Sequence, residues 1–451
     1  MSGHRWRRPA AWVEWAALFG FGVIAVRAAA QTPPASVHRL SLMEALEQAR
    51  AQAPALERLR YLRGSAEAGL TAARAERLPR LALSGSYTRN SNVQELSIPL
   101  PAGGERTIFP NLPNDYRSRA ALSVPLYTGG SIESSVRAAG SELEASEREL
   151  EAAAKDLALE TAAAYWQLVT ARERERVLRE ALAAYESHLV DAGNRARFGL
   201  AARNEVLAVQ VERDRAELRR LEAQQAAEVA QADLVRLLGY APGAAIEPVE
   251  PLAAEIGVEG ALEPLVTEAL DRRGERAALQ ARIDAAGAAI DTARAALRPQ
   301  LGAEAGYDYA NPNRKELPLS GVWTGTWDAS LRLSWTLFDS GRSAAAASRA
   351  AAEVDALRQQ LRDLDQRLRL EVTTVYLEQA SASRSVEVAQ RNLEAARENL
   401  EVARDRYREG VIPSAELLDA EVALQEAGLD LTQSWARRRL AQASLERAVG
   451  R

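Results

Sequence analysis

Residues 326–341 have the sequence Thr-Trp-Asp-Ala-Ser-Leu-Arg-Leu-Ser-Trp-Thr-Leu-Phe-Asp-Ser-Gly, and a long helical pattern follows directly. Apolar and polar side chains alternate here. One face carries Trp327, Ala329, Leu331, Leu333, Trp335 and Leu337. A period of two is typical of a β-strand with one apolar and one polar face. The stretch therefore predicts a strand of about a dozen residues that passes at Gly341 into a helix.

The same passage from strand to helix occurs once before, at Val124-Pro-Leu-Tyr-Thr-Gly-Gly130. Positions 211 residues apart (337 minus 126) match over more than a hundred residues: Leu126 with Leu337, Gly130 with Gly341, Tyr165 with Tyr376, Gly199 with Gly410, and Gly239 with Gly450. A constant offset means that the helical parts of the two halves have the same length. Upstream the offset is 220 (299 minus 79), and the nine extra residues fall near the Pro- and Gly-rich stretch Ser97 to Asn114, which is loop-like by composition.

The sequence therefore predicts an internally duplicated α+β chain. The first repeat spans 31–239, with a helix from about Leu42 to Arg77, a strand hairpin at about 80–127 and a long helical hairpin at 131–238. A linker follows at 240–264. The second repeat spans 265–451, with a helix from about Leu262 to Leu297, a strand hairpin at about 300–339 and a long helical hairpin at 342–449. Each first helix is expected to stop at a proline.

The predicted strands suit a membrane. Strands of about nine to twelve residues cross a bilayer at a tilt, and Tyr87, Tyr307 and Tyr309 lie near strand ends, where aromatic side chains suit the interface. A soluble sandwich sheet is the alternative on the strands alone. Four strands cannot close a barrel, and open sheet edges are not tolerated in lipid. A membrane location thus requires several chains to share one barrel.

The helical segments are rods. Between Ser131 and Arg197 there is no proline, and apolar residues recur every seven positions at Leu143, Leu150 and Leu157. About 65 helical residues make a rod of roughly 100 Å. Taken alone, such rods also fit a soluble periplasmic coiled-coil scaffold. Together with membrane-length strands, they favour a barrel in one membrane that continues as a helical tube across a compartment.

Residues 1–30 have the pattern of a secretory signal peptide: Arg5, Arg7 and Arg8, then an apolar run, then Ala28-Ala29-Ala30. The chain has no cysteine, which excludes disulfides and thiolate metal sites. The net charge of −5 becomes about −8 without the signal, whose four arginines and Glu14 contribute +3. This charge disfavours nucleic acid as a partner.

Nothing in the sequence indicates catalysis. The only histidines are His4, which belongs to the predicted signal peptide, and His38 and His188, which we expect to stand alone. No metalloprotease, nucleophile-elbow, P-loop or dinucleotide motif is present. The sequence predicts neither an enzyme, nor a cofactor, nor a structural metal site.

On these residues, above all the two strand-to-helix junctions and the turns around Gly199 and Gly410, the sequence resembles the outer-membrane efflux protein family, the TolC-like outer-membrane factors of tripartite export systems. The resemblance implies an outer-membrane homotrimer that extends into the periplasm. It would have one 12-stranded β-barrel, with four strands per chain, continued by a long α-helical coiled-coil barrel. Residues 240–264 would lie in an equatorial region. The implied partners are outer-membrane lipid, a periplasmic adaptor protein and an inner-membrane transporter.

The implied function is a passive exit duct for small molecules in a tripartite efflux pump, with the duct of a type I protein secretion system as the alternative. The resemblance also assigns roles to residues near the helical turns. The adaptor-docking tips would be Phe198, Gly199, Leu200, Gly410 and Val411, and the periplasmic aperture would be lined by Glu205, Tyr407, Glu416 and Asp419. Glu416 and Asp419 would form a candidate cation ring. Family members place an arginine where this chain has Ile412, so the closed-state tether is expected to differ here.

Overall fold

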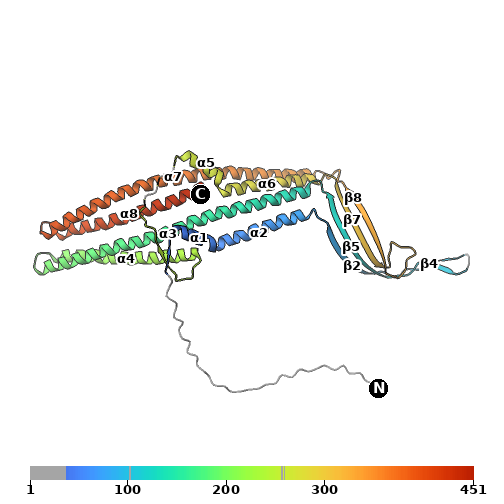
Figure 1. Cartoon of the computed structure of the whole chain (residues 1–451), viewed down its shortest axis with the longest axis horizontal. Helices are drawn as coiled ribbons and strands as arrows, with labels where there is room; N and C mark the ends of the chain where they lie inside the picture. The colour runs from blue at the N-terminus through green and yellow to red at the C-terminus, as the bar shows by residue number, and fades with distance from the viewer. Residues whose placement is uncertain (1–36, 101–102, 255–256, 258–259) are drawn as a thin grey trace, which may run out of the picture.

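A computed structural model describes residues 37–100, 103–254, 257 and 260–451. The predicted signal peptide at 1–30 lies outside these residues. The molecule is elongated, with long helices filling one end and a strand sheet the other (Figure 1). No described helix is long and apolar enough to cross a membrane.

The sheet joins the two halves of the chain. It contains β2 (Arg80–Arg89), β5 (Asn114–Tyr127), β7 (Gln300–Asn311) and β8 (Thr324–Ser334). The strand order is β2-β5-β7-β8, and every pairing is antiparallel. The two hairpins thus pair with each other through β5 and β7, while β2 and β8 are left as edge strands.

The strand predicted from the alternation around Trp327 ends earlier than expected. β8 stops at Ser334 rather than continuing to Leu337. The next residue is Trp335, whose indole Nε1 donates a hydrogen bond of 3.0 Å to the carbonyl of Leu297.

The long helical hairpins have equal lengths in the two halves. Helices α3 (Ser131–Arg197) and α7 (Arg342–Arg408) contain 67 residues each, and α4 (Arg203–Leu238) and α8 (Ser414–Val449) contain 36 each. The residue before each long helix is a glycine with positive φ, 94° at Gly130 and 83° at Gly341. Glycine adopts this backbone without a steric penalty. The equal length predicted from the constant offset is confirmed.

The helix that opens each half is broken, which the sequence analysis did not predict. In the first half α1 (Leu42–Gln52) and α2 (Pro54–Ala75) are separated by Ala53, because a residue before proline disfavours the helical backbone. In the second half the break between α5 (Leu262–Arg272) and α6 (Gly274–Ala295) lies at Arg273. A Cβ on Gly274 would lie 2.7 Å from the carbonyl of Arg148, so the glycine permits close packing on α3.

Two short strand pairs also replace predicted irregular structure. β3 (Leu96–Pro99) and β4 (Glu105–Phe109) form a hairpin within the stretch that composition marked as a loop. β1 (Val37–Leu40) pairs in parallel with β6 (Ala245–Pro248), which belongs to the predicted linker. The largest buried cluster lies beside this second pair and includes Tyr165, Leu234, Leu238 and Ile246. The linker is therefore fixed to the middle of the helical part.

Candidate functional site

Both long hairpins turn through a glycine at the same end of the molecule (Figure 1). Gly199 and Gly410 have φ values of 75° and 73°. The next residue donates a hydrogen bond back to the helix, from Leu200 N to the carbonyl of Arg195 and from Val411 N to the carbonyl of Arg406. These are left-handed helix caps. The glycine adopts positive φ at little steric cost, and the N–H groups that follow satisfy the last carbonyls of the helix.

The turns expose apolar side chains. Phe198 is 81% exposed, Leu200 75% and Val411 60%. Large apolar side chains gathered at the outermost end of a molecule are typical of a contact surface. The residues predicted for adaptor docking therefore lie together at the tips and are accessible in the single chain.

Tyr407 has a different environment from the tip residues, since it is buried in a cluster with Leu400, Ile412 and Leu417. The guanidinium of Arg195, from the other hairpin, lies 4.1 Å from the centre of the Tyr407 ring and donates a 2.7 Å hydrogen bond to its backbone carbonyl. Burial raises the pKa of the Tyr407 phenol, and the nearby Arg195 charge opposes the rise. Ile412 packs inside its own hairpin, and Arg195 supplies a tie between the hairpins at this level.

The predicted aperture acids lie at the starts of the return helices. Glu416 and Asp419 are both exposed in the first turns of α8. Glu205 is half-buried at the start of α4, where its carboxylate accepts a 3.4 Å hydrogen bond from the N–H of Ala202. Among the described residues of one chain, no group of three or more His, Asp or Glu side chains could hold a metal ion. A cation site at Glu416 and Asp419 would need carboxylates from several copies.

The prediction that His38 and His188 stand alone is wrong. The His38 ring stacks on Tyr240 with 4.4 Å between centroids. His188 is only 3% exposed on α3. Its Nδ1 lies 2.8 Å from Oε2 of Glu421, and its Nε2 lies 2.9 Å from Oγ of Ser414, both on α8. The ring also meets the Tyr407 ring edge to face, with 5.5 Å between centroids. A buried polar chain thus joins the first hairpin to the second.

A signal for this contact was available in the sequence. His188 precedes its turn glycine by eleven residues (199 minus 188), and Glu421 follows its own by eleven (421 minus 410). If both turns reach a common rim, these residues lie at similar heights, since helices rise by about 1.5 Å per residue. Height alone does not show which faces of α3 and α8 meet, so the pairing required the structure.

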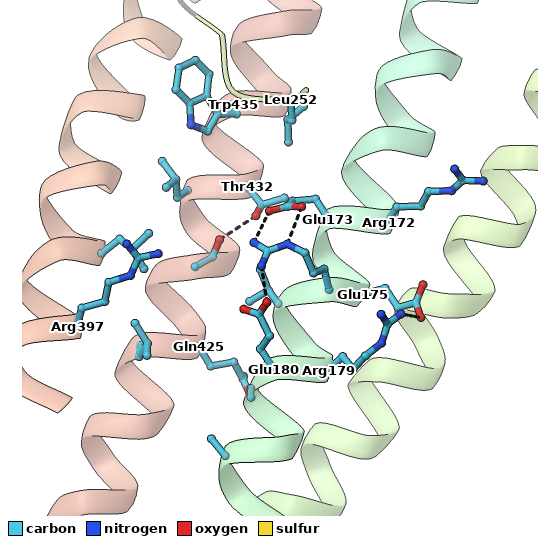
Figure 2. A pocket seen from close by; sticks show the side chains of 18 of the residues that line it. Arg172, Glu173, Glu175, Arg179, Glu180, Leu252, Arg397, Gln425, Thr432 and Trp435 are labelled. Atoms are coloured by element: carbon cyan, nitrogen blue, oxygen red, sulfur yellow. Dashed lines mark hydrogen bonds and ion pairs between the residues drawn. The ribbon is translucent and has the colours of Figure 1, made fainter. Parts of the chain in front are cut away.

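A cleft of about 920 Å³ separates α3 from α7 above this level. Figure 2 shows its charged wall, with Glu173 and Glu180 on α3 and with Trp435 and Leu252 at one end. Arg176 donates hydrogen bonds to both glutamates, at 3.0 Å to Glu173 and at 2.5 Å to Glu180. The two hairpins therefore do not meet through α3 and α7 at the cleft. They meet through the packing of α8 on α3. The bonds of His188 to α8 and of Arg195 to Tyr407 therefore join the hairpins between the cleft and the tips.

The sheet at the other end has two unlike faces. One face exposes large apolar side chains: Leu83 is 83% exposed, Trp327 77%, Leu81 74% and Leu331 72%. The opposite face carries ion pairs. Arg119 contacts Asp308 at 2.7 Å and Asp328 at 2.9 Å, and Lys315 from the β7–β8 loop contacts Asp308 at 2.7 Å.

Aromatic side chains mark both ends of the apolar face. At the end far from the helices, Tyr309 stacks on Trp323 with centroids 5.0 Å apart, and Tyr87 lies 4.9 Å from Tyr116. At the end near the helices, the exposed aromatic residues are Tyr127, Trp335 and Phe338. An apolar band between two aromatic girdles is the pattern of a strand surface in contact with lipid.

Comparison with known proteins agrees with these features. Residues 45–240 and 265–451 match the outer membrane efflux protein family. Over 311 residues the chain is 30% identical to Protein CyaE of Bordetella pertussis. That alignment covers 68% of this chain and 62% of the relative, so it spans less than two thirds of the relative's length.

Solved structures share the fold. The outer membrane protein VceC of Vibrio cholerae superposes with a TM-score of 0.74 at 21% identity, over 91% of this chain and 96% of that one. The open state of the MtrE outer membrane channel of Neisseria gonorrhoeae gives a TM-score of 0.75 at 21% identity, over 91% and 88% of the two chains.

Proposed function

Because the chain belongs to the outer membrane efflux protein family, and so is an export channel protein of the outer membrane that extends into the periplasm, we propose that it is the channel subunit of a tripartite efflux pump. In this role it is a passive exit duct for small molecules. Proteins of this family are channels rather than enzymes, are trimeric, and work with adaptor and inner-membrane partners.

The observation that carries the proposal is the two-faced sheet with its open edges. The apolar face with its two aromatic girdles suits lipid, and the face with Arg119 and Asp308 suits a water-filled interior. An open edge inside a bilayer would leave backbone N–H and C=O groups without partners. The edges therefore have to be paired by other copies of the chain.

The strand directions allow such closure. β2 and β8 run antiparallel to each other across the sheet, so β2 of one copy can pair with β8 of the next in the same antiparallel manner. This head-to-tail contact closes into a ring. Three copies give twelve strands, and the helices of the same three copies continue the ring as a tube.

The helical end provides the other two parts of the function. The exposed turns at Phe198, Leu200 and Val411 form an apolar rim that suits a helical hairpin of an adaptor protein. Glu416 and Asp419, exposed in the first turns of α8, would bring six carboxylates from three copies to the aperture below that rim. Energy for transport comes from the inner-membrane partner.

Membrane fractionation and planar-bilayer recording of the purified protein test the proposal. We expect the protein in the outer-membrane fraction, migrating as a heat-modifiable trimer, and opening channels in a bilayer. Extraction without detergent as a monomer would support a soluble coiled-coil scaffold and overturn the proposal. Deleting the gene in its native host separates the two export functions. Drug sensitivity supports the efflux pump, whereas loss of a secreted protein with unchanged drug sensitivity supports type I secretion.

A further inference from the structure

The two faces of the β3–β4 hairpin differ, and one of them is mainly apolar. Leu96 lies opposite Phe109, the register then shifts by a bulge, and Ile98 lies opposite Arg106. Leu96, Ile98 and Phe109 therefore share a face, with Arg106 at the end of that face nearest the turn. The three apolar side chains are 52%, 49% and 48% exposed, in that order. On the other face the hydroxyls of Ser97 and Thr107 form a 3.0 Å hydrogen bond.

This hairpin is a fixed extension of the sheet. At its base Val93 N donates to Oδ1 of Asn111 and Asn111 N donates to Oε1 of Glu95, both at 3.1 Å. Figure 1 shows it projecting past the end of the sheet farthest from the helices. Glu105 and Arg106 lie close to its turn, and such charges do not suit a lipid interior. The apolar face thus lies beyond the distal aromatic girdle and requires a protein cover.

The same end of the molecule has a second uncovered apolar surface, on the loop between β7 and β8. Leu317 is 76% exposed and Val322 61%. The loop is held at its base, where Nδ2 of Asn313 donates a 3.3 Å hydrogen bond to the carbonyl of Thr324. Within one chain the hairpin face and Leu317 both stay exposed, so they do not cover each other.

We propose that the apolar face of the β3–β4 hairpin packs on the β7–β8 loop, residues 312–323, of a neighbouring copy. The inference rests on the proposed ring closure. The hairpin follows the distal end of edge strand β2, and the loop precedes the distal end of edge strand β8. When β2 of one copy pairs with β8 of the next, these two segments become neighbours.

The proposed contact gives a role to the nine extra residues of the first repeat in this region. The longer segment lies at one edge of the sheet and the shorter one at the other edge, so each junction would bring one of each together. The junction is then held outside the membrane by apolar contact as well as inside it by strand pairing.

The absence of cysteine makes cross-linking a direct test. Two differently tagged full-length chains, one with Ile98→Cys and one with Leu317→Cys, are produced together, and isolated outer membranes are oxidised. We expect a covalent dimer that carries both tags, which an intrachain contact cannot give. The Ile98→Cys, Leu317→Cys double variant should give a covalent trimer. Ser97→Cys is the matched control, since its side chain is on the opposite face and should cross-link at least tenfold less.

A second pair of chains tests the ring itself. Ser84→Cys on β2 and Ser330→Cys on β8 are treated with a bismaleimide, which tolerates an unknown register between copies. Edge cross-linking without the Ile98–Leu317 product overturns the inference and leaves the channel proposal intact. Loss of both products from a monomeric protein overturns the channel proposal. If Ser97→Cys cross-links to Leu317→Cys as well as Ile98→Cys does, the inference is overturned. It is also overturned if the Ile98→Cys thiol is shielded from maleimide but forms no cross-link, because another cover, such as lipid, then protects it.

Discussion

Nδ1 of His188 lies 2.8 Å from Oε2 of Glu421, and this contact joins helices from the two halves of the chain. Both side chains are buried, with 3% and 6% of their surface exposed. Since α8 also carries Glu416 and Asp419, the contact fixes the helix that holds the proposed aperture acids against α3. The packing of the tip should therefore depend on this pair.

Replacing His188 with Leu would leave the Glu421 carboxylate buried without its ring partner. A buried acceptor left without its hydrogen-bond partner costs about 1–3 kcal/mol, so we expect a lower thermal unfolding temperature and more frequent channel opening. Glu421→Gln keeps an oxygen that can accept a hydrogen bond and should cost only about 1 kcal/mol. The His188→Leu, Glu421→Leu double variant should be more stable than the His188→Leu single variant. Additive losses in a double-mutant cycle would show that the two side chains act independently.

Arg195 joins the hairpins through the ring and the backbone carbonyl of Tyr407, and a phenylalanine at this position keeps both groups. We therefore expect Tyr407→Phe to change the channel open time little. Arg195→Ala removes the guanidinium and should increase open time severalfold, since about 1 kcal/mol of hydrogen bonding and cation–π contact is lost. Equal effects of the two substitutions in planar bilayers would instead assign the tie to the phenol hydroxyl.

The sequence predicted the features that depend on local periodicity and on the repeat. Alternation around Trp327 gave the apolar sheet face, and the constant offset gave the equal rods that begin after Gly130 and Gly341. It failed where a distant contact decides the local structure. The break at Arg273 depends on the approach of Gly274 to α3, and the partners of His188 lie more than two hundred residues away. The β3–β4 hairpin was missed because proline and glycine mark turns without showing which strands flank them.

The tip side chains allow a prediction that separates docking from folding. Phe198 and Leu200 are 81% and 75% exposed, so replacing either with Ser should change stability by less than about 0.5 kcal/mol. Copurification of the periplasmic adaptor from the native host should nevertheless fall at least fivefold. Val190, also exposed on α3 but nine residues before Gly199, provides the control as Val190→Ser. Unchanged copurification of the Phe198 and Leu200 variants would show that the adaptor binds elsewhere.

A parallel prediction concerns the acids at the start of α8. Glu416→Ala and Asp419→Ala remove exposed carboxylates that three copies would bring close together. A ring of negative charges of this kind attracts cations. We expect the double variant to show higher single-channel conductance and several-fold weaker block by divalent cations. Asp430→Ala, an exposed acid farther along the same helix, serves as the control. If divalent block is unchanged, these acids only stabilise the helix start.

The junction between the helices of the second half gives a prediction about pH. Arg273, 4% exposed, donates hydrogen bonds to Glu371 at 3.0 Å and Glu275 at 3.1 Å, and Arg447 contacts both acids at 2.8 Å. Burial opposes ionisation of Glu275, but the bonds from Arg273 and the charge of Arg447 outweigh it and hold its pKa below the ordinary value of 4.5. An acid with a lowered folded-state pKa stabilises the fold fully above its unfolded pKa. This stability is lost as the pH falls from about 4.5 through the folded value.

Arg273→Met should therefore have two effects on thermal unfolding. At pH 7 it removes charge-assisted hydrogen bonds from two half-buried carboxylates that still contact Arg447, and we expect a loss of about 1.5–3 kcal/mol. Below pH 4.5 protonation relieves that cost, so the gap between the variant and the natural protein should narrow as the pH falls. Arg367→Met, which removes a solvent-exposed partner of Asp363, is the control and should change stability by under about 1 kcal/mol at either pH. A gap that stays constant from pH 7 to pH 3 would mean that Arg273 acts through packing alone.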